Sequence, residues 1–166
     1  RIRGRNEIYF VVEKFLDFDY NLNYNFVYRE NEYDDEGTPL LRLLCPRENF
    51  SNEHLIERLL QKDVDVSVRN GFGCNALLAL AFRYRSTNGS GNGEKLLQQV
   101  MKRGALIDSV DFDGNTALHW AFLSGRLELV EVLVRNGADF RVKNNGGNIS
   151  LQMADAVNQE LFYFWS

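Results

Sequence analysis

Proline, histidine and cysteine are scarce in this sequence, with two residues of each among 166. Two prolines exclude a proline-rich linker, and two histidines exclude a histidine-rich metal site. The two cysteines, Cys45 and Cys74, are too few for a disulfide scaffold and fit a reducing compartment. We therefore expect an intracellular protein, located in the cytoplasm, the nucleus or both, with no metal and no cofactor.

Long apolar runs and an excess of basic charge are absent as well. The longest apolar stretches, such as Ala76 to Phe82, are far too short to cross a bilayer. Acidic residues outnumber basic residues by 23 to 19, which gives a net charge of −4 and a pI near 5.2. A mildly acidic chain is a poor general binder of nucleic acid or of anionic membrane. Hydrophobic residues make up 45% of the chain, which favours a packed core.

A 33-residue unit from Asp111 to Lys143 has the pattern of a turn, a short helix, a second turn and a second short helix. In the opening turn, Gly114 can adopt a positive φ angle. Thr116 is placed to cap the first helix, which we expect to run to about Ser124. Apolar residues recur at helical spacing in both helices. They are Ala117, Leu118, Ala121 and Phe122 in the first helix, and Leu129, Val130, Leu133 and Val134 in the second.

Glycines follow both helices of this unit, at Gly125 and Gly137, where a left-handed residue can end a helix. Neither helix is long enough to be stable alone in water, since isolated helices shorter than about 12 residues are marginal. The unit therefore needs copies of itself on both sides to bury its apolar faces.

Two short motifs resemble a known family. NTALHWA, which begins at Asn115, is similar to the T-P-L-H-x-A motif of ankyrin repeats, and GADF, which begins at Gly137, is similar to that family's G-A-D-V. The resemblance implies an all-α fold, a solenoid of stacked helix-turn-helix units with hairpin loops. It further implies that His119 and the neighbouring threonine tie one hairpin to the next, and that the chain binds a protein or peptide.

Copies of the unit cover the rest of the chain: EGTPLLRLL and NGFGCNALLALAF upstream, and NNGGNISLQMADA downstream. We predict a single ankyrin-repeat domain over 1–166. Its parts are a partial leading repeat 1–32, repeats of about 33–69, 70–110 and 111–143, and a truncated last repeat 144–166.

Three features depart from the repeat pattern. Asp63 stands where a glycine is expected. The Ser/Gly/Asn-rich segment 86–93 is expected to be a dispensable loop, because its composition cannot bury apolar area. The loop at 24–33 is rich in aromatic residues, so it either folds back over the first helix or forms a binding finger.

Signatures of catalysis are missing: no HExxH, GxSxG or CxxC sequence occurs. We therefore predict a chain that is not itself an enzyme. It could instead be a regulatory or substrate-recruiting part of a larger enzyme. Another alternative is an ankyrin domain that senses a small oligonucleotide through stacking and charge, although the acidic balance argues against it. That alternative would use Phe72, Phe82, Arg83, Tyr84 and Arg85.

In ankyrin proteins, the hairpin tips and the outer surface of each first helix form the binding side. Carried onto this chain, the clearest repeat offers Phe112, Asp113, Asn115, Trp120, Leu123 and Ser124. The repeat before it offers Phe72, Cys74, Phe82 and Arg83, and the region further upstream offers Tyr28, Asp34 and Asp35. Phe72 and Phe112 are the most informative, because hairpin tips usually carry polar side chains. We expect them to anchor a partner, unless each packs onto its neighbouring hairpin.

From its two ends, we expect the chain to be a processed product or, as we favour, a fragment of a larger protein. The chain starts at Arg1 without a methionine, and it closes on the apolar sequence LFYFWS. A terminal repeat normally turns a polar face outward. An adjacent domain or a second copy of the chain is therefore expected to cover the C-terminal end.

Overall fold

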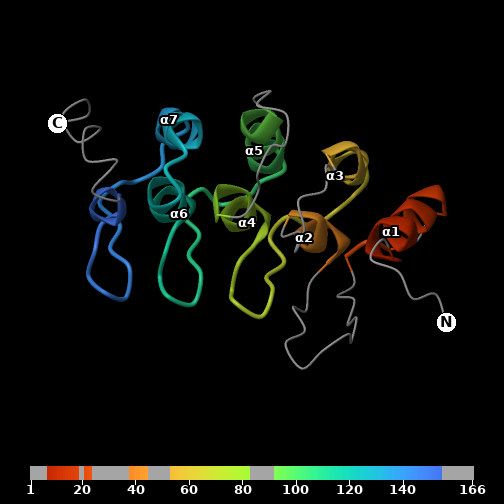
Figure 1. Cartoon of the computed structure of the whole chain (residues 1–166), viewed down its shortest axis with the longest axis horizontal. Helices are drawn as coiled ribbons and strands as arrows, with labels where there is room; N and C mark the ends of the chain where they lie inside the picture. Colours follow the sequence, from red (N-terminus) through yellow and green to blue (C-terminus); the bar gives the residue numbers. More distant parts are fainter. Residues whose placement is uncertain (1–6, 19–20, 24–37, 45–52, 83–91, 155–166) are drawn as a thin grey trace.

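A computed structural model of the protein describes residues 7–18, 21–23, 38–44, 53–82 and 92–154. The helices in these ranges form one elongated array (Figure 1). They are α1 (Glu7–Asp17), α2 (Pro39–Leu44), α3 (Glu53–Leu60), α4 (Ala76–Phe82), α5 (Asn92–Lys102), α6 (Ala117–Leu123), α7 (Leu127–Arg135) and the 3-10 helix η1 (Ser150–Met153). The same ranges contain no named strand, and isolated bridges join Val110 to Thr116 and Lys143 to Ile149.

The array has two rows of helices. Helices α2, α4, α6 and η1 follow one another in the first row, and α3, α5 and α7 form the second (Figure 1). The hairpins extend from the first row, on the side away from the second. Contacts between α4 and α6, and between α5 and α7, join one helix pair to the next. The predicted all-α solenoid is confirmed.

Short polar side chains begin each α-helix of the first row. The backbone N–H of Leu41 donates to Thr38 Oγ1 at 3.5 Å, and that of Leu78 donates to Asn75 Oδ1 at 3.0 Å. Thr116 is the N-cap of α6, as predicted, and Ser124 is its C-cap. A cap satisfies a backbone donor that the first turn leaves unpaired, which matters most in helices this short.

The helices of the clearest repeat end as expected. Gly125 and Gly137 have φ angles of 63° and 91°, in the left-handed region. Asp63, by contrast, does not adopt the left-handed conformation of the glycine that it replaces, because no described non-glycine residue has a positive φ. Asn23 contacts this exit instead: its Nδ2 donates to the carbonyl of Asp63 at 3.1 Å, and its Oδ1 accepts from the N–H of Asp65 at 2.6 Å.

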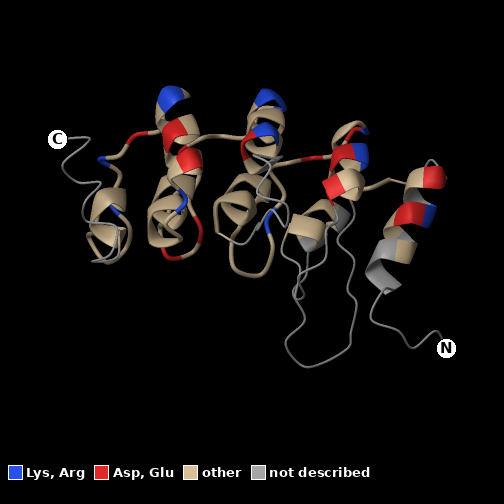
Figure 2. Cartoon of the chain, turned by 45° about the horizontal axis from the view of Figure 1, so that its top comes forward, with Lys and Arg blue, Asp and Glu red and all other residues tan. Residues whose placement is uncertain are grey.

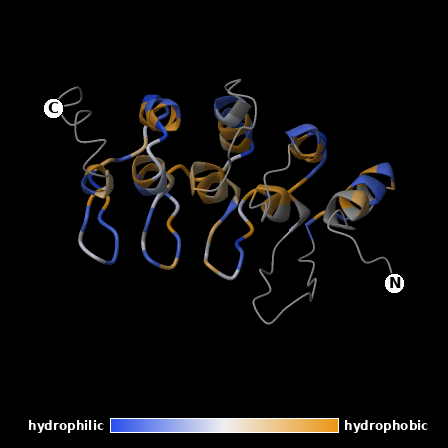
Figure 3. Cartoon of the chain, in the orientation of Figure 1, coloured by the Kyte–Doolittle hydropathy of each residue, from blue (hydrophilic) through white to orange (hydrophobic). Residues whose placement is uncertain are grey.

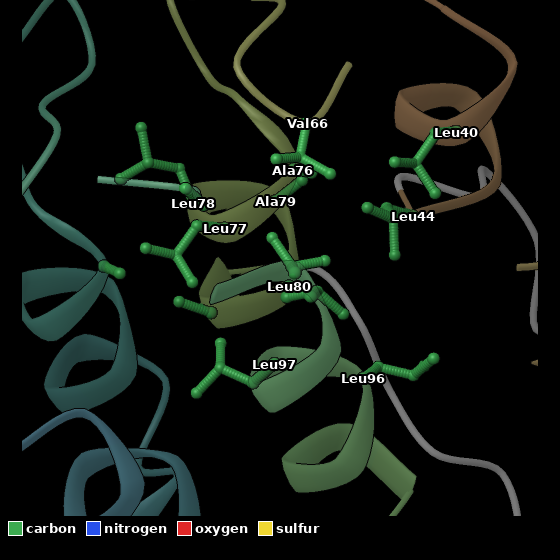
Figure 4. Packing of buried hydrophobic residues seen from close by; sticks show 14 of the residues in the cluster. Leu40, Leu44, Val66, Ala76, Leu77, Leu78, Ala79, Leu80, Leu96 and Leu97 are labelled. Carbon is green, nitrogen blue, oxygen red and sulfur yellow. The ribbon is translucent and has the colours of Figure 1, made fainter. Parts of the chain in front are cut away.

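The core lies between the two rows and runs along the array. Leu40 and Leu44 of α2 lie on one side of α4, while Leu77 of α4 and Leu97 of α5 lie where their helices meet (Figure 4). Helix α4 is almost wholly buried, because it packs against helices on both sides and against α5. Helices of the second row carry both hydrophobic and hydrophilic residues, as Figure 3 shows. In α7, Val132 is buried in addition to the predicted stripe, and Val134 is only partly buried.

The structure refines two expectations about segments that differ from the repeat pattern. The first helix of the last repeat is the 3-10 helix η1 rather than an α-helix. Helix α5 begins at Asn92, so a deletion of 86–93 would also remove the start of a helix. Most of that loop, the loop at 24–33 and the C-terminal LFYFWS lie outside the described residues.

His119 is fully buried and joins α6 to the next hairpin. The backbone N–H of Thr116 donates to its Nδ1 at 3.2 Å, so Nδ1 is an acceptor and Nε2 carries the proton. That Nε2 donates to the carbonyl of Asn148 at 3.1 Å. The neutral imidazole therefore stabilises the helix start and the contact between repeats together, as the family resemblance implies.

Replacing this histidine should destabilise the array. His119→Ala removes the hydrogen bonds to Thr116 and Asn148 and leaves a cavity at a fully buried position, so we expect a loss of about 2 kcal/mol in the free energy of unfolding. Urea denaturation followed by circular dichroism measures it. His54→Ala is the matched control, because that side chain is 65% exposed, and it should change stability by less than about 0.5 kcal/mol. Equal losses of stability in the two variants would contradict a stabilising role for the hydrogen bonds of His119 between the two hairpins.

Candidate binding surface

Three hairpins share one turn, built around a side-chain oxygen. Asn70 Oδ1 accepts from the N–H groups of Phe72 and Cys74, both at 3.0 Å. Asp111 Oδ1 and Asn144 Oδ1 each accept from the residues two and four places further on, at 2.8–3.0 Å. Asn and Asp favour such turns because the short side chain bonds the local backbone. The three tips therefore have the same backbone shape.

Neighbouring tips are joined by backbone hydrogen bonds. The N–H of Phe112 donates to the carbonyl of Phe72 at 3.4 Å, and the N–H of Asn145 donates to the carbonyl of Asp113 at 2.9 Å. Asn145 Nδ2 also donates to the carbonyl of Phe112 at 2.9 Å. We call this series of bonds the tip ladder. It fixes the spacing at which tip side chains are presented.

Phe72 and Phe112 are exposed on adjacent tips. Their exposed fractions are 58% and 69%. The ring of Phe112 does approach the neighbouring hairpin, since a Cβ on Gly73 would lie 2.7 Å from its Cδ1. Both alternatives raised by the sequence thus hold in part for Phe112: it rests on the neighbouring tip and still turns most of its surface to solvent.

The first helices continue the apolar surface behind the tips. The rings of Phe82 on α4 and Trp120 on α6 lie 4.2 Å apart between centroids and are tilted by 39°. Trp120 Nε1 donates to Asp111 Oδ2 at 2.7 Å, which fixes the indole. Both rings are partly buried, and Leu123 at the end of α6 is 40% exposed. We name Phe72, Phe112, Asp113, Phe82, Trp120 and Leu123 the tip–helix surface.

Charged residues are unevenly distributed over the array. Neither α4 nor α6 contains one, whereas second-row helices carry both signs (Figure 2). Asp113 contributes an exposed carboxylate to the tip–helix surface. Outside it, the hydrogen bond from Arg141 lowers the pKa of Asp139, and that from Ser67 lowers the pKa of Asp65. The surface is therefore aromatic, with acidic charge at its rim.

Some predicted contact residues are not available to a partner. Asn115 is 5% exposed, because its Oδ1 accepts from Asn144 Nδ2 of the next hairpin at 2.8 Å. Cys74, at the matching place one repeat earlier, is 8% exposed. Ser124 is exposed beside Leu123. The remaining predicted residues lie outside the described residues: Tyr28, Asp34, Asp35 and Arg83.

In the part of the chain that is described, no group of three or more His, Cys, Asp or Glu side chains could hold a metal ion. No described helix combines the length and the apolar character that a membrane span needs. A pocket between α3 and α5, which the sequence motifs do not indicate, is lined mainly by polar and charged side chains.

Comparison with known proteins agrees with this architecture. The 131 residues that align with Palmitoyltransferase AKR1 of Saccharomyces cerevisiae are 30% identical and make up 75% of this chain and 16% of that protein. Notch-regulated ankyrin repeat-containing protein of Homo sapiens is 39% identical over 61 residues, 37% of this chain and 54% of that protein. Alpha-latroinsectotoxin-Lt1a of Latrodectus tredecimguttatus is 42% identical over 50 residues, 30% of this chain and 4% of that protein.

The chain thus spans about half or less of the length of each of these relatives. Residues 11–144 match the family model for ankyrin repeats in three copies, which covers most of the chain. Together with the paired helices, the capped first row and the tip ladder, this match shows that the chain belongs to the ankyrin repeat family.

Proposed function

We propose that this chain is a non-catalytic module that binds a protein or peptide through the tip–helix surface. Ankyrin repeats are generally protein-interaction modules. The observation that carries the proposal is the exposure of Phe72 and Phe112 on adjacent tips joined by a backbone hydrogen bond. Large exposed aromatic side chains at fixed spacing are typical of interface hot spots, because they bury much area with few rotatable bonds.

The shape of the surface favours a protein or peptide over a small molecule. Its apolar side chains come from two tips and two helices, so a partner must extend across a repeat boundary to contact them all. The tip ladder holds the backbone in place, so binding does not have to order it. Asp113 at the rim favours a partner with a basic residue beside its apolar contact.

The oligonucleotide alternative gains no support from the described surface. Its basic residues, Arg83 and Arg85, lie outside the described ranges, and Asp113 would repel a phosphate. The alternative of a part of a larger enzyme is compatible with the similarity to a yeast palmitoyltransferase. In that case too, we propose that the chain supplies recruitment rather than catalysis.

The test uses a peptide selected from a random library against the wild-type chain. We expect Phe72→Ser with Phe112→Ser to weaken its binding by about 2 kcal/mol or more, with little loss of stability, because both side chains are mostly exposed. Calorimetry measures the affinity, and thermal unfolding is followed on the same samples.

Phe140→Ser is the matched control, because Phe140 is 54% exposed and lies outside the tip–helix surface. It should leave the affinity within about twofold of the wild type, as expected for a residue outside the interface. If the double variant unfolds while the peptide still binds to its folded fraction, or if all three serines weaken binding equally, the proposed site is wrong.

A further inference from the structure

A second surface feature lies on the other row of helices. Between α3 and α5 there is a pocket of about 300 Å³. These helices stand in the row opposite the hairpins (Figure 1), so the pocket is separate from the tip–helix surface. Its lining residues are Glu57, Leu60, Gln61, Lys95, Gln99, Lys102 and Arg103.

Two contacts across the pocket hold its walls together. The guanidinium of Arg103 donates to the carbonyl of Leu60 at the end of α3. Lys95 Nζ lies 2.7 Å from Glu57 Oε1, with both side chains partly exposed. The pocket is therefore preformed by bonds between neighbouring repeats, and a ligand does not have to create it.

The charge that remains in the pocket is positive. Glu57 balances Lys95, whereas Arg103 bonds to a neutral carbonyl and keeps its full charge. Among the described residues, no anionic group pairs with Lys102. Two uncompensated cations thus face one small pocket on a chain whose net charge is −4. That concentration of charge favours an anionic group.

Besides the positive charge, Gln99 gives the pocket a second chemical feature, a hydrogen-bond acceptor. Its Oε1 is buried and has no hydrogen-bond partner among the described residues. Buried polar atoms in folded proteins are nearly always paired, so this oxygen would gain a hydrogen bond if the Gln99 side chain turned toward a donor in the pocket. Gln99 lies three residues before Lys102 on α5 and four before Arg103, which directly follows the helix, so the acceptor and the two cations lie close together.

We infer that this pocket binds an acidic segment of a protein partner. A carboxylate of that segment pairs with Lys102 and Arg103. The Gln99 side chain turns toward the pocket, where its Oε1 accepts from a backbone N–H beside that carboxylate. A peptide supplies an anion and a neutral donor a few ångströms apart, which matches the two requirements of the wall. A volume of about 300 Å³ holds one or two side chains, so the pocket would read a short acidic stretch.

The first experiment uses a substitution that introduces a carboxylate side chain into the pocket. The probe is a fluorescent, end-blocked peptide of alternating aspartate and glutamate, titrated against the full chain in low salt with anisotropy as the readout. We expect Gln99→Glu to weaken binding at least about tenfold, since its carboxylate occupies the cations and repels the peptide. Gln98→Glu adds the same charge at the next, exposed position and should change binding by less than about threefold.

A second pair of variants avoids any change to a buried atom. Lys102→Gln removes a cation of the pocket, and Lys143→Gln removes one from a distant hairpin. We expect about fivefold weaker binding in the first and less than twofold in the second. The Phe72→Ser and Phe112→Ser variant should bind the acidic peptide like the wild type, so failure of the proposed function and failure of this inference are distinguishable.

Several outcomes would overturn the inference. One is equal weakening by Lys102→Gln and Lys143→Gln, which would indicate attraction without a site. Another is equal affinity for the matching peptide of asparagine and glutamine. A third is displacement of the acidic peptide by inorganic phosphate at concentrations equimolar with the peptide, which would make the pocket a phosphate site instead.

Discussion

Leu77→Ala should lower the free energy of unfolding by about 3–5 kcal/mol, the range typical of a fully buried leucine whose surroundings relax little. Leu77 is completely buried in α4. That helix packs against α2, α5 and α6, so a cavity there removes contacts from three neighbours and cannot be filled by one of them moving. Urea denaturation monitored by circular dichroism gives the loss.

The control for this prediction makes the same substitution on the next helix of the row. Leu123→Ala removes a leucine that is 40% exposed and should cost about 1 kcal/mol or less. Similar losses in the two variants would contradict the prediction. They would mean that the core around α4 does not contribute to the free energy of unfolding that denaturation measures.

Gly114→Ala should cost about 3 kcal/mol, because two effects add. Gly114 has a φ of 77°, where a side chain is strained. An added Cβ would also lie 2.7 Å from Asn145 Oδ1 and 2.9 Å from its backbone nitrogen. The second contact is to backbone that forms the tip ladder, so relief of the clash separates two hairpins.

Gly147→Ala separates the backbone strain from the clash, because it has only the first of the two. Its φ of 78° is nearly the same, but nothing lies within 4 Å of the added Cβ. We expect only the strain of the left-handed conformation, about 1–2 kcal/mol. Chemical denaturation of both variants measures the difference. If the two losses are equal, the tips separate without cost and the ladder contributes no stability.

Local chemistry made much of this fold predictable from the sequence. Thr116 and Gly125 mark the start and end of α6 because a cap and a left-handed residue depend on the chain within a few residues. The role of His119 followed from the family resemblance, and its bonds to Thr116 and Asn148 match that role. The exposure of Phe72 and Phe112 could be expected from their place on turns.

What the sequence left unresolved depends on neighbouring repeats. Asn115 was expected to face a partner, but a side chain from the following hairpin pairs with it and buries it. Nothing in the sequence around Gln99 shows that its oxygen lacks a donor, since that depends on which side chains the fold brings near it. The contact between Phe82 and Trp120 likewise joins two repeats and has no local signal.

The tip ladder has a consequence for how such a surface can evolve. It uses backbone atoms at Phe72, Phe112 and Asp113, so the identity of those three side chains is not what joins the hairpins. Turn-forming oxygens and glycines within each hairpin carry the shape. Selection can therefore exchange tip side chains one at a time, and acquire a new partner, while the scaffold beneath them stays intact.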